Sequence, residues 1–344
     1  MSRINTKILH GLLNINAPTN HETAMREYIK SLIPRNKQLS KLSDVNTSLS
    51  YYLNANKRST ILLDAHMDEI RAQVIGITHQ GFLSINFTGA LAEFMHGRPV
   101  KIFSTKLNKT LPGIILIQQA HLKGVREKHS DPYNKSVLYV DIGCSSKRAA
   151  SAKIEIGDYL LLDYSYRYLN KNIISARGLD NKLGVYSLVQ IILYALKHVK
   201  TLKYNIVINF SGDEETAKSS IGHLKKFKLK SVIVIDTDWA SDMPFINQDI
   251  YGSVNIGDGV VVTRSDEDDG LYRTFKNLAH KHKIPIQIAA PTAGGSTLSS
   301  YITQYTATTQ FIGIPLRNIH SPVETANLKD CLAAIQLVIK FISK

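Results

Sequence analysis

The sequence predicts an α/β protein: a mostly parallel sheet covered by helices, with a small β-barrel-like domain inserted into it. Towards both ends of the chain, short apolar runs alternate with amphipathic helical patterns, which is typical of parallel sheets with helices on both faces. Between them, residues 71–165 hold only short β-rich runs separated by turn signals. We therefore expect residues 1–70 and 166–344 to form one α/β domain around an inserted domain at 71–165.

The first elements are two helices and a strand. Residues 7–33 predict a helix, a turn at 16–20 and a second helix, with Thr19 or Asn20 as the N-cap of the second helix. Residues 59–65 form a continuous apolar run, as expected of a strand buried on both faces.

The insertion and the remaining chain follow in order. Six β-rich runs, punctuated by glycine, asparagine and proline, are expected in the insertion at 72–78, 82–87, 99–103, 113–118, 137–142 and 159–163. Helices are then expected at 181–199, 271–282 and 327–342, and strands at 204–210, 231–235, 284–288 and 308–312.

Bulk composition narrows the class of protein. Of the 344 residues 44% are hydrophobic and 20% are charged, and two cysteines exclude a disulfide scaffold. No apolar run reaches the roughly 18 residues of a membrane span, and no signal peptide begins the chain, so we expect a cytoplasmic protein without a membrane partner. The net charge of +14 would suit an anionic partner. Because the basic residues are scattered and no nucleic-acid motif accompanies them, nucleic acid is not expected.

Residues able to ligate metal stand at five places in the predicted α/β domain: after the strands 61–65, 204–210 and 232–235, after a short strand at 173–175, and after the segment 312–319. They are His66 and Asp68, Asp180, the pair Glu214 and Glu215, Asp236, and His320. In open α/β sheets ligands bind at the carboxyl ends of strands, and His, Asp and Glu are the ligand set of zinc, cobalt or manganese. Each residue alone has a structural explanation, such as a helix N-cap for Asp180 or first-turn acids for the glutamates. Independent explanations at all five positions are less favoured than one shared site.

Two divalent cations about 3.5–4 Å apart need a bridging carboxylate, and Asp180 at a tight turn is the natural bridge. A metal-bound His66 needs an acceptor at its other ring nitrogen, which Asp68 can supply. One of Glu214 and Glu215 can ligate metal while the other acts as general base. This arrangement predicts amide hydrolysis by an activated water. Neither G-x-S-x-G nor a phosphate-binding glycine motif is present.

These residues lie in segments that resemble the tetrahedral aminopeptidases, peptidase family 42 of the dimetal metallopeptidases, some of which carry an endoglucanase label. The segments are 64–69, 178–184, 213–215, 234–236 and 319–324, with further similarity at 140–147 and 156–158. The resemblance implies removal of N-terminal residues from peptide substrates, and homo-oligomers, usually dodecamers, assembled in part through the insertion.

The resemblance also assigns the ligands. It places His66, Asp180 and Asp236 on one metal, and Asp180, Glu215 and His320 on the other. It makes Glu214 the general base and Asp68 the residue that orients His66. The two divalent ions are expected to be zinc or cobalt, with manganese as the third choice.

The sequence departs from the family pattern near the site. Asp213 replaces a usual Gln, residues 216–220 replace a glycine-rich stretch, Thr297 stands where the family has an acid, and Asn181 and Lys182 replace a common Asp-Arg. None of these changes removes a metal ligand, so they concern the substrate pocket. Two alternatives remain: a hydrolase of the same fold acting on another amide or a glycan, and a non-catalytic basic assembly protein.

Overall fold

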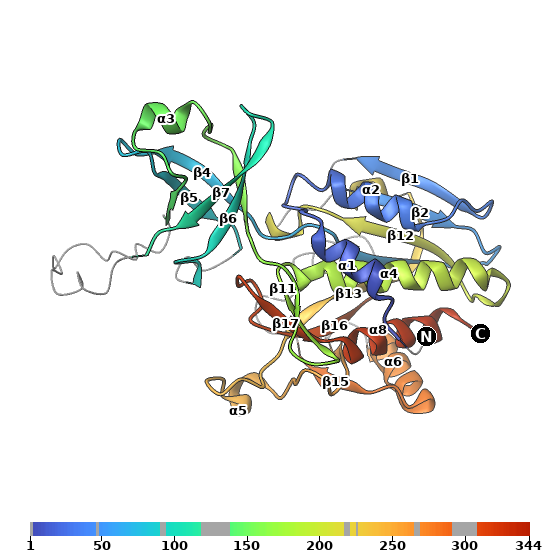
Figure 1. Cartoon of the computed structure of the whole chain (residues 1–344). Helices are drawn as coiled ribbons and strands as arrows, with labels where there is room; N and C mark the ends of the chain where they lie inside the picture. Colours follow the sequence, from blue (N-terminus) through green and yellow to red (C-terminus); the bar gives the residue numbers. More distant parts are fainter. Residues whose placement is uncertain are drawn as a thin grey trace. The chain divides into compact units, whose positions relative to one another are not determined.

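The computed structural model describes residues 3–45, 48–89, 94–117, 138–216, 221–224, 226–264, 269–290 and 308–344 (Figure 1). The chain divides into two compact units. The first comprises Met1–Glu69, Tyr166–Ile319 and Glu324–Lys344, and the second comprises Ile70–Ser165 together with His320–Val323. No helix among the described residues is long and apolar enough to cross a membrane.

The first unit is built on a large mixed sheet, in the order β1-β2-β12-β3-β13-β16-β17-β11-β10, with β14 beside β16 and β15 beyond it. Its strands are β1 (Leu39–Val45), β2 (Ser48–Leu53), β3 (Thr60–His66), β10 (Arg167–Tyr168), β11 (Ile173–Ala176), β12 (Asn205–Ser211), β13 (Leu229–Trp239), β14 (Val260–Thr263), β15 (Ile286–Ala289), β16 (Thr309–Arg317) and β17 (Glu324–Asn327). The central strands β12, β3, β13 and β16 run parallel, and the strands on either side of them pair antiparallel. The predicted fold class is confirmed, with the parallel order concentrated at the centre.

Helices cover this sheet. They are α1 (Thr6–Asn14), α2 (Thr23–Leu32), α4 (Leu179–Lys197), α5 (Gln248–Tyr251), α6 (Asp269–His282) and α8 (Leu328–Ile342). The larger core joins one sheet face to these helices except α5, which has no buried residue, and α4, buried over most of its length, runs through it. A helix with so many buried positions packs as a central element of the domain.

The two faces of the sheet hold different residues of the same strand. Ile61, Leu63 and Ala65 of β3 belong to the larger core, whereas Leu62 belongs to a second cluster with Val234 of β13. Side chains alternate along a strand, so residues two apart share a face. His66 is four residues from Leu62, and it therefore points to the face of the second cluster. Asp236 follows Val234 by two residues and shares that face, which places both side chains on the same side of the sheet.

The turn before α2 differs from the prediction that Thr19 or Asn20 caps this helix. Glu22 occupies the N-cap position without a capping side-chain hydrogen bond, and α2 begins at Thr23. Asn20 has a positive φ of 69°, and the Thr19 hydroxyl donates to Asp68 instead of to the helix. The prediction was wrong because the tertiary partner of Thr19 lies 49 residues away.

The second unit contains a closed barrel, as the β-rich runs predict. Its strands follow the order β4-β5-β8-β7-β6-β9. They are β4 (Ala72–Ile77), β5 (Leu83–Phe87), β6 (Pro99–Ser104), β7 (Lys109–Ile115), β8 (Leu138–Asp141) and β9 (Tyr159–Leu162), and α3 (Lys147–Ser151) follows β8. Alternate residues such as Leu83 and Ile85, or Val100 and Ile102, fill its interior.

Candidate metal centre

Three of the predicted ligands come from neighbouring elements of the first unit. His66 is the last residue of β3, and Asp236 lies within β13, the strand paired with β3. Asp180 lies in the first turn of α4, just after Gly178, which has a left-handed conformation. The peptide bond between Asp180 and Asn181 is cis. We expected Asp236 to follow its strand; instead β13 continues to Trp239 along β16, while its pairing with β3 ends at Val234.

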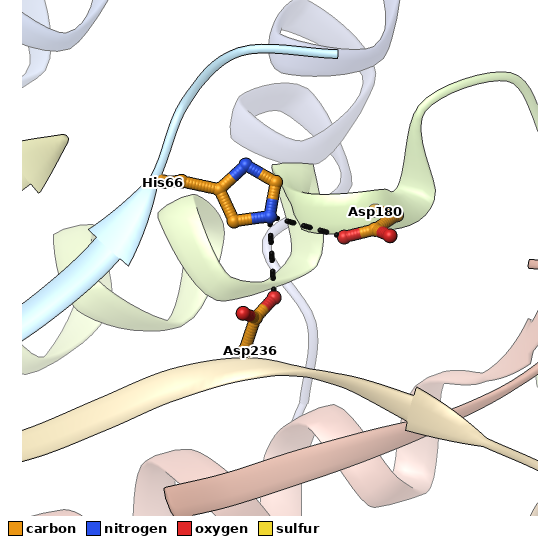
Figure 2. A group of neighbouring side chains, drawn as sticks. All are labelled: His66, Asp180 and Asp236. Carbon is orange, nitrogen blue, oxygen red and sulfur yellow. Dashed lines mark hydrogen bonds and ion pairs between the residues drawn. The ribbon is translucent and has the colours of Figure 1, made fainter. Parts of the chain in front are cut away.

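The three side chains point toward one another (Figure 2). The His66 Nε2 lies 3.1 Å from Asp180 Oδ1 and 3.3 Å from Asp236 Oδ1. One ligand atom from each residue lies within 4.8 Å of the others, and all three residues are buried. A nitrogen and two carboxylate oxygens that converge in this way fit a divalent ion such as zinc, cobalt or manganese.

Buried carboxylates need a positive partner, and the electrostatics of this group reflect that. Burial lowers the pKa of His66, but the Asp236 and Asp180 carboxylates outweigh burial and hold it well above its ordinary value. Burial raises the pKa of Asp236, and His66 partly offsets the increase. An imidazolium thus balances the acids when no metal is present. A divalent cation on Nε2 would take over this role with the ring neutral.

A second group shares one member with the first. Asp180, Glu215 and His320 also offer ligand atoms that all lie within 4.8 Å of one another. Glu215 belongs to the short 3-10 turn Glu214–Thr216 after β12, and His320 lies between β16 and β17. The structure therefore brings all five predicted ligands into two groups with Asp180 in common. A carboxylate shared between two ligand groups is the arrangement that a pair of metal ions requires.

Asp68 is fully buried, and its carboxylate contacts one residue of each ligand group, His66 and Glu215. Its Oδ1 lies 3.3 Å from the Nδ1 of His66 and accepts the backbone N–H of Glu214 at 3.3 Å. Its Oδ2 accepts the backbone N–H of Glu215 at 3.2 Å and the hydroxyl of Thr19 at 2.9 Å. Asp68 thus lies against the Nδ1 side of the His66 ring and binds both backbone amides of the turn that carries the glutamates.

Glu214 is half-buried and differs from its neighbour. Burial raises the pKa of Glu214 to about 7, the Asp236, Asp180 and Asp68 charges add to the increase, and His66 opposes it. A carboxyl group whose pKa lies near neutral pH can take up and release a proton at working pH, as a general base and acid must.

Two further residues support the site, although the sequence alone assigns no role to either. Glu324 of β17 accepts the backbone N–H of Asp180 through Oε2 at 3.0 Å. Asn181 donates to the carbonyl of Ile235 at 2.9 Å and accepts the N–H of Gly184. The donated bond needs an amide, so this departure from the family pattern has a structural use.

Lys182, the other departure in this segment, is buried in an ion network. Its Nζ donates to the carbonyl of Ile15 at 2.8 Å and lies 3.2 Å from Glu69, which also pairs with Arg177 at 3.0 Å. Burial lowers the pKa of Lys182 to about 8, although the Glu69 charge opposes this decrease. The network ties the start of α4, and so Asp180, to the segment before α2. The position of Thr297 and residues 217–220 lie outside the described part of the chain.

Comparisons with known proteins relate the chain to a family of aminopeptidases. The M42 glutamyl aminopeptidase family profile matches residues 48–337. The lysyl aminopeptidase of Pyrococcus furiosus is 24% identical, over 80% of this chain and 79% of that protein. The TET aminopeptidase of the marine sediment archaeon Thaumarchaeota archaeon SCGC AB-539-E09 superimposes with a TM-score of 0.86 and 22% identity, over 98% of this chain and 96% of that one.

The Pyrococcus horikoshii TET1 peptidase, which assembles into a tetrahedron or a large octahedral shell, superimposes with a TM-score of 0.82. It is 25% identical, over 98% of this chain and 99% of that one. The family profile spans most of the chain, including His66, Asp68, Asp180, the glutamate pair, Asp236 and His320. The chain belongs to the M42 glutamyl aminopeptidase family of metallopeptidases.

Proposed function

We propose that this protein is a metal-dependent aminopeptidase that uses two divalent cations, zinc or cobalt, to remove N-terminal residues from peptides. The observation that carries the dimetal assignment is the pair of ligand groups that share Asp180. His66, Asp180 and Asp236 would hold one ion, and Asp180, Glu215 and His320 the other. When bound, such ions polarise the scissile carbonyl and make water a stronger nucleophile at neutral pH.

The protein's own groups perform the proton transfers and the positioning. The Glu214 carboxylate takes a proton from the attacking water and returns it to the leaving amine, a role open to it because it stands next to the ligand Glu215 and is only half-buried. Asp68 holds the His66 ring through Nδ1 so that Nε2 faces Asp180 and Asp236. The backbone bonds from Glu214 and Glu215 to Asp68 keep the general base and its neighbouring ligand in fixed positions.

The test compares metal content with turnover. Protein stripped with a chelator and reloaded with zinc, cobalt or manganese should bind about two equivalents, the number that a shared carboxylate implies. Aminoacyl-arylamides and unblocked peptides should be hydrolysed, whereas their N-acetylated counterparts and a soluble β-glucan should not. Turnover of the glucan or of blocked substrates would favour the alternative hydrolase, and absence of metal binding would favour the assembly protein.

We also propose that residues 71–165 mediate self-association into a homo-oligomer, with a dodecamer as the expected form. The TET1 peptidase, which forms closed shells, supports this because its similarity spans nearly the whole of this chain. The barrel supports it too, because Ile75, Ile114 and Tyr139 expose large apolar side chains on its strands. A cytoplasmic location stays a prediction.

Sedimentation of the intact chain tests the assembly. We expect a particle many times larger than the 38.4 kDa of one chain. The variant Ile114→Asp should shift the distribution toward smaller species, because it places a charge on the exposed apolar side of the barrel. A monomer at all micromolar concentrations would contradict self-association and leave the metal site unaffected.

A further inference from the structure

Thr19 makes a contact with the metal centre that is not explained by its place in the sequence. It lies in the segment between α1 and α2, with only 1% of its surface exposed. Its hydroxyl donates to Asp68 Oδ2 at 2.9 Å, whereas the alternative acceptor, the carbonyl of Glu69, is 3.4 Å away. A hydroxyl has a single proton to donate, so the shorter contact to the carboxylate is the one it makes.

The Asp68 carboxylate accepts three hydrogen bonds and lies against His66, and the bond from Thr19 is the shortest of the three. Each carboxylate oxygen can accept about two hydrogen bonds. Oδ1 faces the Glu214 amide and the Nδ1 of His66, both at 3.3 Å, and Oδ2 faces the Glu215 amide at 3.2 Å and Thr19 at 2.9 Å. The other three partners belong to the ligands and the general base themselves. Of the four groups that contact the carboxylate, only the Thr19 hydroxyl comes from a residue outside the proposed ligands and general base.

The segment that carries Thr19 is held in register with the backbone next to Asp68. The Glu69 N–H donates to the carbonyl of Ala17 at 2.9 Å, and the Thr19 N–H donates to the carbonyl of Glu69 at 3.2 Å. The side chain of Glu69 accepts the N–H of Ala17 at 2.8 Å and also pairs with the buried Lys182. Thr19 is therefore a rigid donor, because two backbone bonds and a buried charge fix its position relative to Asp68.

We propose that Thr19 is a positioning residue of the metal centre: its hydroxyl sets the rotation of the Asp68 carboxylate, and thereby the tilt of His66 and the position of the Glu214–Glu215 turn. The inference rests on the proposed dimetal function. Without the hydroxyl, Oδ2 keeps only the Glu215 amide, and the carboxylate can rotate inside a buried site. Loss of a group that hydrogen-bonds and orients a metal ligand typically lowers metal affinity or activity by about 10–100-fold.

Two substitutions at one position separate the hydroxyl from the packing. Thr19→Val keeps the shape of the side chain and removes the donor, whereas Thr19→Ser keeps the donor. Thr105→Val is the matched control, because the Thr105 hydroxyl also donates to a buried aspartate, Asp158, at 2.7 Å in the barrel unit. All three variants are measured as full-length protein for melting temperature, for cobalt affinity with its visible absorption spectrum, and for kcat and KM on an aminoacyl-arylamide.

We expect Thr19→Val to weaken cobalt binding and lower kcat by about tenfold or more, with an altered cobalt spectrum and a KM within about twofold. Thr19→Ser should have the cobalt affinity, cobalt spectrum and kcat of the wild type. Thr105→Val should leave these three properties unchanged even if its melting temperature falls. The proposal is overturned if Thr19→Val binds cobalt and turns over like the wild type, or if Thr19→Ser is as impaired as Thr19→Val. If the wild type lacks aminopeptidase activity, the proposed function fails, and cobalt affinity and spectrum still decide the role of Thr19.

Discussion

Glu214 and Glu215 are adjacent in the chain, and the structure gives them different surroundings. Glu215 is buried and belongs to the ligand group of Asp180 and His320. Glu214 is more exposed, and its pKa of about 7 suits a group that moves protons. Both backbone amides are bound to Asp68, so the pair cannot exchange positions by a small rotation of the turn.

This difference predicts two distinct mutant phenotypes. Glu214→Gln should keep the fold and the metal content but lower kcat by about 10²–10⁴-fold, because the amide cannot accept the proton from water. Glu215→Gln should instead reduce the metal content toward one equivalent. Kinetics together with elemental analysis distinguish the two, and a near-normal rate for Glu214→Gln would mean that the roles are assigned wrongly.

The ligand types at the strand ends and the acceptor Asp68 could be read from the sequence, whereas the other residues that hold the site could not. His66, Asp180, Glu215, Asp236 and His320 are recognisable because each has metal chemistry of its own. Lys182 has no such signal, since its partners Glu69 and Ile15 lie 113 and 167 residues away. Only a fold brings such groups together, and a residue pattern within one segment does not contain that information.

Among the elements, those with a continuous apolar run or a strong helical period were predictable. The strands β3, β12 and β16 are examples, because they are largely buried and rich in Val, Ile, Leu and Phe. β1 (Leu39–Val45) was not predicted, because its sequence LSKLSDV is largely polar and lies at the edge of the sheet. Its strand state comes from pairing with β2, and strand propensity depends on such context.

Asp330 connects α8 to a neighbouring loop and gives that element a pH dependence. Its carboxylate accepts the backbone N–H groups of Gly257 at 2.6 Å and Gly259 at 2.9 Å. Burial raises its pKa to about 7, although these bonds oppose the increase. Because the folded-state pKa exceeds the unfolded value, the neutral group favours folding at low pH. That contribution is lost as pH rises through about 7.

Asp330→Asn removes this titration while keeping a carbonyl acceptor. The melting temperature of the wild type relative to the variant should therefore fall between about pH 5 and about pH 8. Asp249→Asn, which removes an exposed acid on α5, controls for the change in net charge. A constant difference between wild type and Asp330→Asn across this range would show that the group does not titrate there.

At the scale of the whole molecule, the net charge of +14 is the property that neither the fold nor the ligand set requires. The five proposed ligands and the proposed general base need only local carboxylates and imidazoles, and most Lys and Arg residues lie at other positions along the chain. A positive field around a protein raises the local concentration of anions and the rate at which they are encountered. If the field extends to the entrance of the site, acidic peptides should reach it fastest.

We therefore expect kcat/KM at low ionic strength to be higher for peptides that carry Asp or Glu beyond the scissile bond than for matched neutral or basic peptides. The advantage should fade near 1 M salt, where the Debye length is about 3 Å, because screening removes long-range attraction while contacts inside the pocket persist. The same three peptides at low and high salt, measured under conditions where encounter contributes to the rate, provide the test. Equal kcat/KM values for the three peptides at low salt would show that the charge lies too far from the site to select substrates. A preference for basic peptides would show the same; the relative from Pyrococcus furiosus is named a lysyl aminopeptidase. An acidic preference that survives high salt would instead indicate a cationic side chain within the pocket itself.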